Sequence, residues 1–338
     1  MNICFTLDYE LFLGAATGTV ERCLIQPMNR YAEVAREVGM RFTIFVDASY
    51  LYALHKQAEA HPALAEDWHQ IEQQLLRLQR EGHDLQLHIH PQWYYSTFDG
   101  HAWRLDTKHY CLHDVPRSEM LRLFRESKQL LDHLLGKHTR AFRAGGFSAQ
   151  PTALLTQLFA ENGLRVDSSV CPGTFYRSAH QRYDYRAVRS DAPYRFADDI
   201  CRQQPDGPFT EIPLSMCRVS PLFQWRLLAV RLGEKLQRQG RHVPYGDGQS
   251  VRTIRASILR RLSWPTDAMA TIDGYKINFL PRAIRTHLRS GCESMCVLGH
   301  PKLATPHSVE HLAEICRYAQ SCGCEFRTFS DLILHEEA

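Results

Sequence analysis

The chain has 338 residues, with 40 Lys and Arg against 37 Asp and Glu, so its formal charge is +3. Hydrophobic residues make up 44% and charged residues 23%, which is the composition of an ordinary globular protein. The small basic excess excludes the clustered positive charge of a nucleic-acid binder, and we expect no nucleic-acid partner. The length allows two domains or one α/β barrel.

The cysteines and the N-terminus indicate the cellular compartment in which the protein works. Eleven cysteines, an odd number, are scattered through the chain, which favours a reducing environment. No secretory leader precedes the first apolar run, and no stretch approaches the roughly 20 apolar residues of a membrane span. We therefore expect a cytoplasmic protein. The pairs Cys292/Cys296 and Cys322/Cys324 lack the spacing of a zinc ribbon, so we expect no zinc knuckle there.

Short apolar runs alternate with longer segments of helical period, which is the pattern of βα units and a parallel sheet. The predicted strands are 3–8, 42–47, 84–90, 140–143, 210–214, 295–299 and 325–328. The predicted helices between them are 29–38, 68–81, 118–135, 152–162, 283–289 and 308–320, and Gly39, Gly82, Gly136 and Gly163 suit helix ends. We predict a single α/β domain over 1–338, an irregular (β/α)7-type barrel with functional residues where strands end.

Two segments depart from this alternation. Residues 171–207 are rich in Tyr, Arg, Asp and Pro without a clear period, and we expect a long loop over one end of the sheet. Residues 221–262 form a predicted helical insertion, with helices at 222–239 and 251–262. The first helix has an apolar face beside basic residues, which suggests contact with a membrane surface. The alternative is that this face packs on its own domain.

Two histidines stand at the end of the third predicted strand. His88 and His90 lie two residues apart and therefore point to the same side, and Pro91 marks the strand end. Paired imidazoles suit a divalent metal, and a catalytic site adds a third protein ligand. The end of the first strand offers two carboxylates, Asp8 and Glu10, one for the metal and one for a proton. The alternative is a His-x-His pair without metal.

Three further strand ends carry polar residues. Arg143 precedes the pair Gly145 and Gly146, and its guanidinium is able to hold a carboxylate. Asp167 follows a short strand, where it either orients a histidine or caps a turn. His300 closes the apolar strand 295–299. Alone, each has an ordinary structural explanation, but together they occupy the edge where a barrel places its active site.

In this order, these segments resemble the polysaccharide deacetylase family, the NodB-homology fold of carbohydrate esterase family four. Residues 6–10 are similar to its first-strand Thr-Phe-Asp-Asp motif, 41–46 to its Ala-Thr-Phe-Phe-Val run and 82–85 to its Gly-His-Glu-Ile run. Residues 143–147 are similar to its arginine motif, 167–169 to its aspartate motif and 298–300 to its last histidine motif. The resemblance covers almost the whole chain.

The chain departs from the family pattern at three places, of which one is the absence of the usual Pro-Tyr after Arg143. Gln92 stands where the family has its second metal histidine, and Tyr9 stands where it has the metal-binding aspartate. The resemblance therefore implies substitutes, with Glu10, His88 and His90 as metal ligands and Asp8 as the base. The reverse assignment of the two carboxylates stays open.

The resemblance implies a metal-dependent hydrolase that removes an N-acetyl, or alternatively an O-acetyl, group from a sugar or polysaccharide precursor. Asp8 would take a proton from water, and His300 would protonate the leaving amine. Arg143 would keep Asp8 ionised, and Asp167 would orient or tune a catalytic group. Zinc is the expected ion, with cobalt, nickel, iron or manganese as alternatives.

The resemblance also implies bacterial surface-polysaccharide biosynthesis, such as O-antigen or capsule. The expected substrate is an acetylated saccharide linked to a nucleotide or a lipid, which places the protein in the cytoplasm or peripherally at the inner membrane.

Three alternatives compete with a deacetylase. One is a degenerate deacetylase fold that binds a carbohydrate without hydrolysing it, as the departures at Tyr9 and Gln92 suggest. Another is an amidohydrolase-type barrel, but its His-x-His pair belongs to the first strand, and here two strands come earlier. A non-haem iron oxygenase also uses two histidines and a carboxylate, but its all-β jelly roll does not fit this alternation.

Overall fold

The computed structural model describes residues 1–237, 240–251 and 256–332. The chain divides into two compact units. Unit 1 consists of Met1–Phe42 and Ser215–Ala338, and unit 2 is Thr43–Leu214. The prediction of a single domain stays a prediction, and each unit is described by itself.

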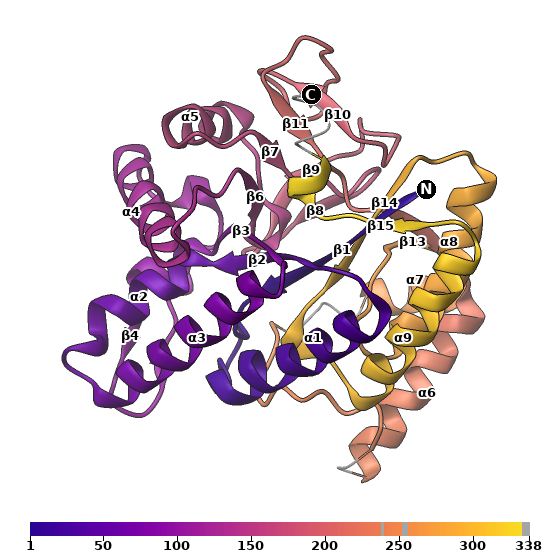
Figure 1. Ribbon diagram of the computed structural model, residues 1–338, viewed down its shortest axis with the longest axis horizontal. Coiled ribbons are helices and arrows are strands. Elements are labelled where there is room, and N and C mark those ends of the chain that lie inside the picture. Colours follow the sequence, from indigo (N-terminus) through magenta and orange to yellow (C-terminus); the bar gives the residue numbers. More distant parts are fainter. Residues whose placement is uncertain (238–239, 252–255, 333–338) are drawn as a thin grey trace. The chain divides into compact units, whose positions relative to one another are not determined.

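Unit 1 joins the two ends of the chain, coloured indigo and orange to yellow in Figure 1. Its strands are β1 (Asn2–Tyr9), β12 (Met216–Val219), β13 (Thr266–Met269), β14 (Ser294–Gly299) and β15 (Glu325–Phe326). Its helices are α1 (Gln26–Val38), α6 (Pro221–Gln237), α7 (Ala256–Ser263), α8 (Leu280–Arg289) and α9 (Pro306–Ser321). Short helical turns η1 (Glu21–Ile25), η5 (Gly274–Phe279) and η6 (Pro301–Leu303) connect them.

The core of unit 1 is built on β1, which is buried along nearly its whole length. It pairs in parallel with β14 from Asn2↔Ser294 to Leu7↔Gly299, and with β15 on its other side. Helix α1 packs against α9. Parallel strands covered by helices are hydrophobic on both faces, which explains why β1 and β14 show unbroken apolar runs in the sequence.

Unit 2 is a second set of βα units. Its parallel strands are β2 (Thr43–Asp47), β3 (Asp84–Ile89), β6 (Ala141–Ala144), β7 (Val166–Asp167) and β11 (Phe209–Glu211), and antiparallel β10 (Tyr194–Phe196) forms the edge. The spatial order is β10-β11-β7-β6-β3-β2. Its helices are α2 (Ala48–Ala58), α3 (Pro62–Arg80), α4 (Arg117–Leu135) and α5 (Thr152–Asn162).

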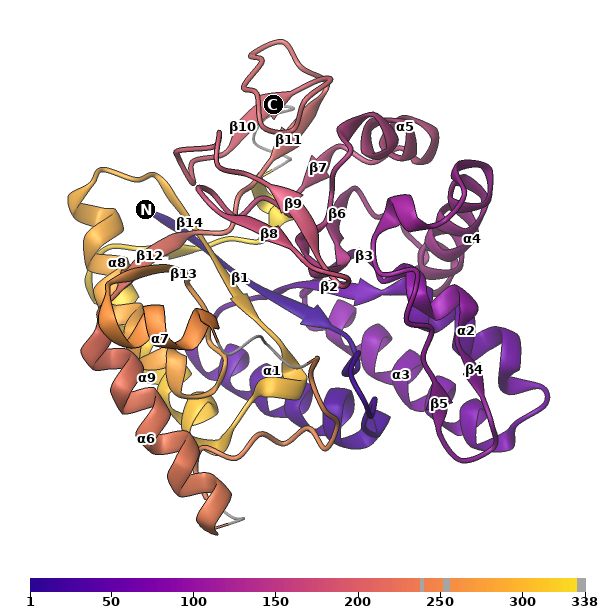
Figure 2. The ribbon, with the colours of Figure 1, turned by 180° about the vertical axis from the view of Figure 1, so that it is seen from behind.

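Two hairpins pair β4 (Thr97–Phe98) with β5 (Trp103–Arg104), and β8 (Phe175–Arg177) with β9 (Arg182–Asp184), the latter visible in Figure 2. The turns of unit 2 are η2 (Pro91–Tyr95), η3 (Leu112–Asp114) and η4 (Gly145–Phe147).

The predicted elements have counterparts in the structure. Every predicted strand and helix corresponds to an observed one, and α5 has the predicted bounds. Gly39, Gly136 and Gly163 end their helices with positive φ, as predicted. Within the predicted insertion, α6 and α7 are observed, whereas residues 238–239 and 252–255 lie outside the described residues. No helix among the described residues is long and apolar enough to cross a membrane.

One prediction of the fold was wrong. Residues 171–207 are not a plain loop, because they contain the β8–β9 hairpin and strand β10. Each of these strands has only three residues, which is too short for alternation to appear in the sequence. The prediction also missed α2, which follows β2 directly, with Asp47 at the end of the strand as its N-cap.

Candidate functional site

The histidine pair lies at the carboxyl end of β3 in unit 2. The rings of His88 and His90 meet edge to face, with centroids 4.7 Å apart. His88 Nδ1 lies 2.7 Å from the carbonyl oxygen of Arg143, and a carbonyl only accepts, so Nδ1 carries the proton. In the neutral ring, a proton on Nδ1 places the lone pair on Nε2, which is the tautomer that a metal-binding histidine uses when Nδ1 donates to a carbonyl.

The position of His90 is fixed by its neighbours. The Ser49 hydroxyl accepts a hydrogen bond from the His90 backbone N–H at 2.8 Å, and it also contacts Asp47. On the other side, a Cβ added to Gly145 would stand 2.6 Å from His90 Nδ1. The turn after β6 therefore requires glycine at position 145, because a larger residue would push the imidazole away.

Arg143 and Asp167 lie beside this pair in a buried polar cluster. The Arg143 guanidinium donates to the carbonyl and hydroxyl oxygens of Ser168 at 2.8 and 2.9 Å. The Asp167 carboxylate accepts from the N–H and hydroxyl of Ser169. Burial raises the pKa of Asp167 to about 6, although hydrogen bonds with Glu211 and Ser169 and the charge of Arg143 oppose this rise. The predicted role of Arg143 in holding Asp8 stays a prediction.

Unit 1 carries the other predicted residues. Asp8 and Glu10 stand at the carboxyl end of β1, and His300 follows the adjacent parallel strand β14. His300 Nε2 lies 3.8 Å from an oxygen of each carboxylate. Glycine at position 299 allows β14 to pack closely against its neighbours, because a Cβ there would meet the side chains of Ile272 and Leu7 at 2.5 and 2.9 Å.

A carboxylate that the sequence did not indicate orients His300. Asp273 accepts hydrogen bonds from the His300 backbone N–H at 2.8 Å and from ring Nδ1 at 3.0 Å. Burial lowers the pKa of His300, but the carboxylates of Asp273, Asp8 and Glu10 outweigh it, so this pKa lies above its ordinary value. Asp273 therefore makes a contact with a histidine that Asp167 does not make among the described residues, and the predicted role of Asp167 in orienting or tuning a catalytic group stays a prediction.

Lys302 is the second residue that the sequence did not indicate. Its buried ammonium donates to Glu10 Oε1 at 2.8 Å and to the carbonyl oxygen of Leu11 at 2.7 Å. A cation on one oxygen of Glu10 competes with a metal for that carboxylate. Lys302 therefore bears on the open choice between Glu10 and Asp8 as the metal ligand.

Two of the positions that depart from the family pattern are buried. Tyr9 is 2% exposed and Gln92 is completely buried. The Gln92 amide has no hydrogen-bond partner within the described part of the chain. Neither residue presents an exposed side chain to a substrate.

Comparison with known proteins identifies the fold of this chain. No family model matches the sequence, and no curated protein matches it. The chain is similar to a solved structure described as a probable polysaccharide deacetylase from Pseudomonas aeruginosa PAO1, with a TM-score of 0.52 and 14% identity over 99% of this chain and 90% of that one. It is also similar to Puue allantoinase, with a TM-score of 0.50 and 14% identity over 99% and 89% of the two chains.

A third similar structure is the GH57 branching enzyme TK1436 from Thermococcus kodakaraensis, with a TM-score of 0.50 and 10% identity over 98% of this chain and 70% of that one. These likenesses confirm the predicted α/β barrel-type fold class. Since three different activities share the fold, the function has to be argued from the site.

Proposed function

We propose that this protein is a metal-dependent hydrolase that removes an N-acetyl group from a saccharide. The observation that carries the proposal is the His88–His90 pair at the carboxyl end of β3, whose rings lie edge to face with centroids 4.7 Å apart. Unit 1 adds two carboxylates and a histidine held by an aspartate. These are the groups that metal-assisted amide hydrolysis requires.

Glu10, His88 and His90 are the proposed metal ligands. Two imidazoles and a carboxylate suit zinc, and also cobalt, nickel, iron or manganese. A bound ion would supply Lewis-acid polarisation of the acetyl carbonyl and of a water molecule. On Glu10, the contact of Lys302 with Oε1 makes Oε2 the proposed ligand atom.

Asp8 and His300 divide the proton transfers in this proposal. Asp8 accepts the proton of the attacking water, and protonated His300 delivers a proton to the leaving nitrogen. Asp273 supports this assignment, because its bond to Nδ1 fixes the ring with Nε2 toward the two carboxylates. Arg143 and Asp167, buried beside the histidine pair, are proposed to fix its electrostatic surroundings.

The test compares His88→Ala and His90→Ala with His138→Ala. The control residue is in the same unit, and its side chain is 90% exposed. We expect the first two variants to lose bound zinc and acetate release from N-acetylglucosamine oligomers, because each loses an imidazole ligand. His138→Ala should keep both, as measured by elemental analysis and an acetate assay.

Three outcomes separate the competing functions. Full metal content and activity in both ligand variants would exclude the site. A wild-type protein that binds the oligomers and the metal but releases no acetate would be the degenerate carbohydrate binder. Release of acetate from O-acetylated sugars alone would make it an esterase.

We further propose that the substrate is a precursor in surface-polysaccharide biosynthesis, carried on a nucleotide or a lipid and processed in the cytoplasm. The same role includes a peripheral contact with the inner membrane through residues 221–262. The exposed apolar side chains of α6 and α7 support this contact.

A further inference from the structure

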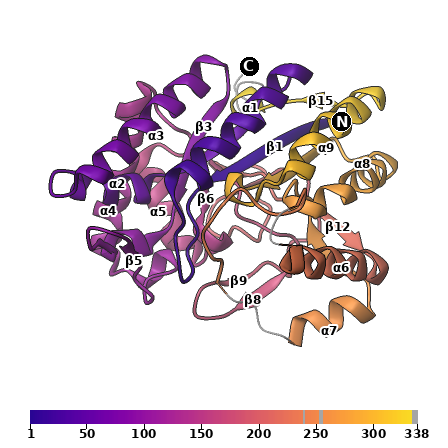
Figure 3. The same cartoon turned by 90° about the horizontal axis from the view of Figure 1, so that it is seen from below.

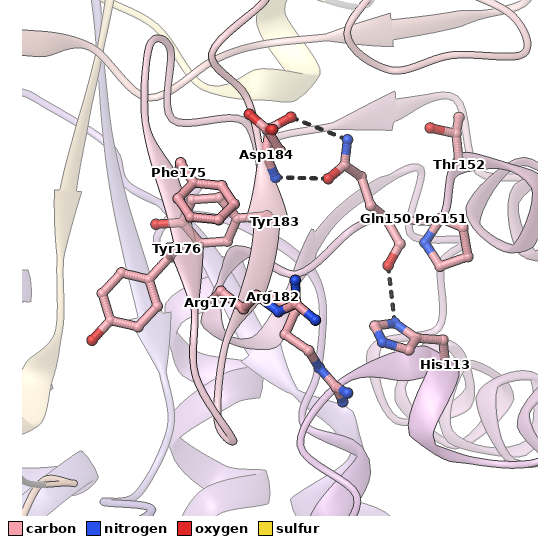
Figure 4. A pocket seen from close by; sticks show the side chains of 10 residues that line it. All are labelled: His113, Gln150, Pro151, Thr152, Phe175, Tyr176, Arg177, Arg182, Tyr183 and Asp184. Carbon is pink, nitrogen blue, oxygen red and sulfur yellow. Dashed lines mark hydrogen bonds between the residues drawn. The ribbon is translucent and has the colours of Figure 1, made fainter.

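A hollow of about 480 Å³ lies in unit 2, outside the histidine pair. Figure 4 shows it between the β8–β9 hairpin and the segment that leads into α5. Phe175, Arg177 and Arg182 come from the hairpin, and His113 and Gln150 stand opposite. Its volume is in the range of small-molecule sites, and it combines apolar walls with a few polar groups.

The hairpin brings two arginines together in this hollow. Arg177 and Arg182 are direct cross-strand partners, so their side chains leave the same face of the hairpin. Like charges placed opposite each other destabilise a strand pair. Arg182 is paired with Asp114, whereas the Arg177 guanidinium has no ion pair or hydrogen bond among the described residues.

The remaining acid in the hollow does not compensate Arg177. Asp184 makes a salt bridge with Arg186 at 2.6 Å. The hollow therefore offers positive charge and N–H donors to an anion.

The other groups fit a sugar ring. His113 Nδ1 donates to the Gln150 carbonyl oxygen at 3.1 Å, which leaves Nε2 as an acceptor for a hydroxyl. Phe175 is 51% exposed, and the Arg186 guanidinium lies over its ring, 4.7 Å from the centroid, so the exposed remainder of the ring supplies an apolar surface for the C–H face of a sugar.

We propose that this hollow binds the anionic group of a saccharide, either a sugar carboxylate or a phosphate that links the sugar to a carrier. Arg177 and Arg182 hold the anion through charge-assisted hydrogen bonds. The proposal rests on the proposed function only in taking the ligand to be a saccharide.

The hollow is joined to the histidine pair through a single turn. The Arg182 backbone N–H donates to the Ser148 hydroxyl at 3.1 Å, and the Tyr185 hydroxyl donates to the Phe147 carbonyl oxygen at 2.7 Å. The same turn begins at Gly145, where an added Cβ would stand 2.6 Å from His90 Nδ1. Arg182 therefore connects the hollow to the turn that positions a proposed metal ligand, and in this proposal the hollow selects acidic substrates.

The test is titration calorimetry with glucuronate, glucose 1-phosphate, glucose and inorganic phosphate. It uses wild-type protein, Arg177→Gln and the control Arg189→Gln, which changes an exposed arginine of unit 2 outside the hollow. We expect one of the acidic sugars to bind at least about tenfold more tightly than glucose, because charge-assisted bonds contribute about 1.5–3 kcal/mol. Arg177→Gln should remove this preference, and Arg189→Gln should keep it.

The two acidic sugars distinguish a carboxylate site from a phosphate site. Equal binding of glucose and both acids, or full binding by Arg177→Gln, would overturn the proposal. Inorganic phosphate that binds as tightly as glucose 1-phosphate would overturn its saccharide part. The titration repeated in His90→Ala separates this site from the catalytic proposal, because binding in the hollow should persist when deacetylation is lost.

Discussion

Lys302 shows how one side chain changes the chemistry of the site. A lysine with only 8% of its side chain exposed requires an anionic partner, and Glu10 is that partner. If Glu10 is also the metal ligand, the ammonium and the ion compete for the same carboxylate. If Asp8 is the ligand, Lys302 merely neutralises its neighbour.

Replacement of Lys302 by methionine separates these cases. With Glu10 as ligand, we expect zinc affinity to rise about tenfold, because the competing cation is gone, and the metal-free protein to lose about 3 kcal/mol of stability from the unpaired carboxylate. Lys128→Met is the control, since Lys128 is equally buried and pairs with Asp132 at 2.6 Å. It should destabilise the protein without changing zinc affinity, as measured by chelator competition and thermal unfolding. Unchanged affinity in Lys302→Met would make Asp8 the ligand.

At the scale of elements, the turn after β6 determines the position of the His90 imidazole. Gly145→Ala places a methyl group 2.6 Å from the imidazole, so we expect zinc affinity to fall about 10- to 100-fold, as when a supporting residue of a metal site is lost. Gly233→Ala in α6 is the control, because a Cβ there meets nothing within 4 Å. It should keep zinc affinity and stabilise the helix by up to about 1 kcal/mol. Equal zinc affinity in both variants would show that Gly145 does not position His90.

The sequence predicted the elements that carry long buried strands and missed those defined by tertiary contacts. The ends of β1, β3 and β14 follow apolar runs, so the polar residues after them are visible in the sequence. Asp273 was not predicted as a site residue, because its segment forms only an isolated β-bridge, Thr271↔Leu298, beside β14. The pattern that would have indicated Asp273 is a carboxylate directly after 268–272, a run that is apolar except for Thr271, just as Asp8 follows a run that is apolar except for Thr6.

At the scale of the whole chain, the alternation of strands and helices was sufficient for the fold class. Partners distant in sequence were not predictable, because Lys302 and Glu10 are 292 residues apart and only folding brings them together. Nor did the fold decide the activity, since similar structures include one described as a probable polysaccharide deacetylase, an allantoinase and a branching enzyme. The activity of this protein therefore depends on the chemistry of the side chains at its site.

The helical insertion combines exposed apolar side chains with basic ones. Phe223 of α6 packs on Tyr275 and Phe279 of unit 1, so part of its apolar face is covered, as the alternative prediction held. Another part is not. Helix α6 lies alongside α7 (Figure 3). The exposed apolar stripe consists of Leu222, Trp225 and Leu232 on α6, together with Leu259 on α7 and Trp264 just after it, each 53–72% exposed.

Charge favours a membrane over a second copy of the chain as the partner of this stripe. Arg226, Arg231, Arg260 and Arg261 are exposed beside it. A symmetric dimer through this stripe would bring the arginines of two copies into one interface, whereas an anionic bilayer attracts them and accepts tryptophan and leucine at its interface.

We therefore expect the protein to sediment with phosphatidylglycerol vesicles and to stay in solution with phosphatidylcholine vesicles, because the arginines need anionic headgroups. Leu222→Ser combined with Trp264→Ser should reduce the bound fraction at least severalfold, since each removes apolar area that would enter the interface. Phe175→Ser is the matched control, because Phe175 is similarly exposed but lies in unit 2. Equal sedimentation of all variants, or concentration-dependent dimerisation abolished by the double substitution, would assign the stripe to another partner.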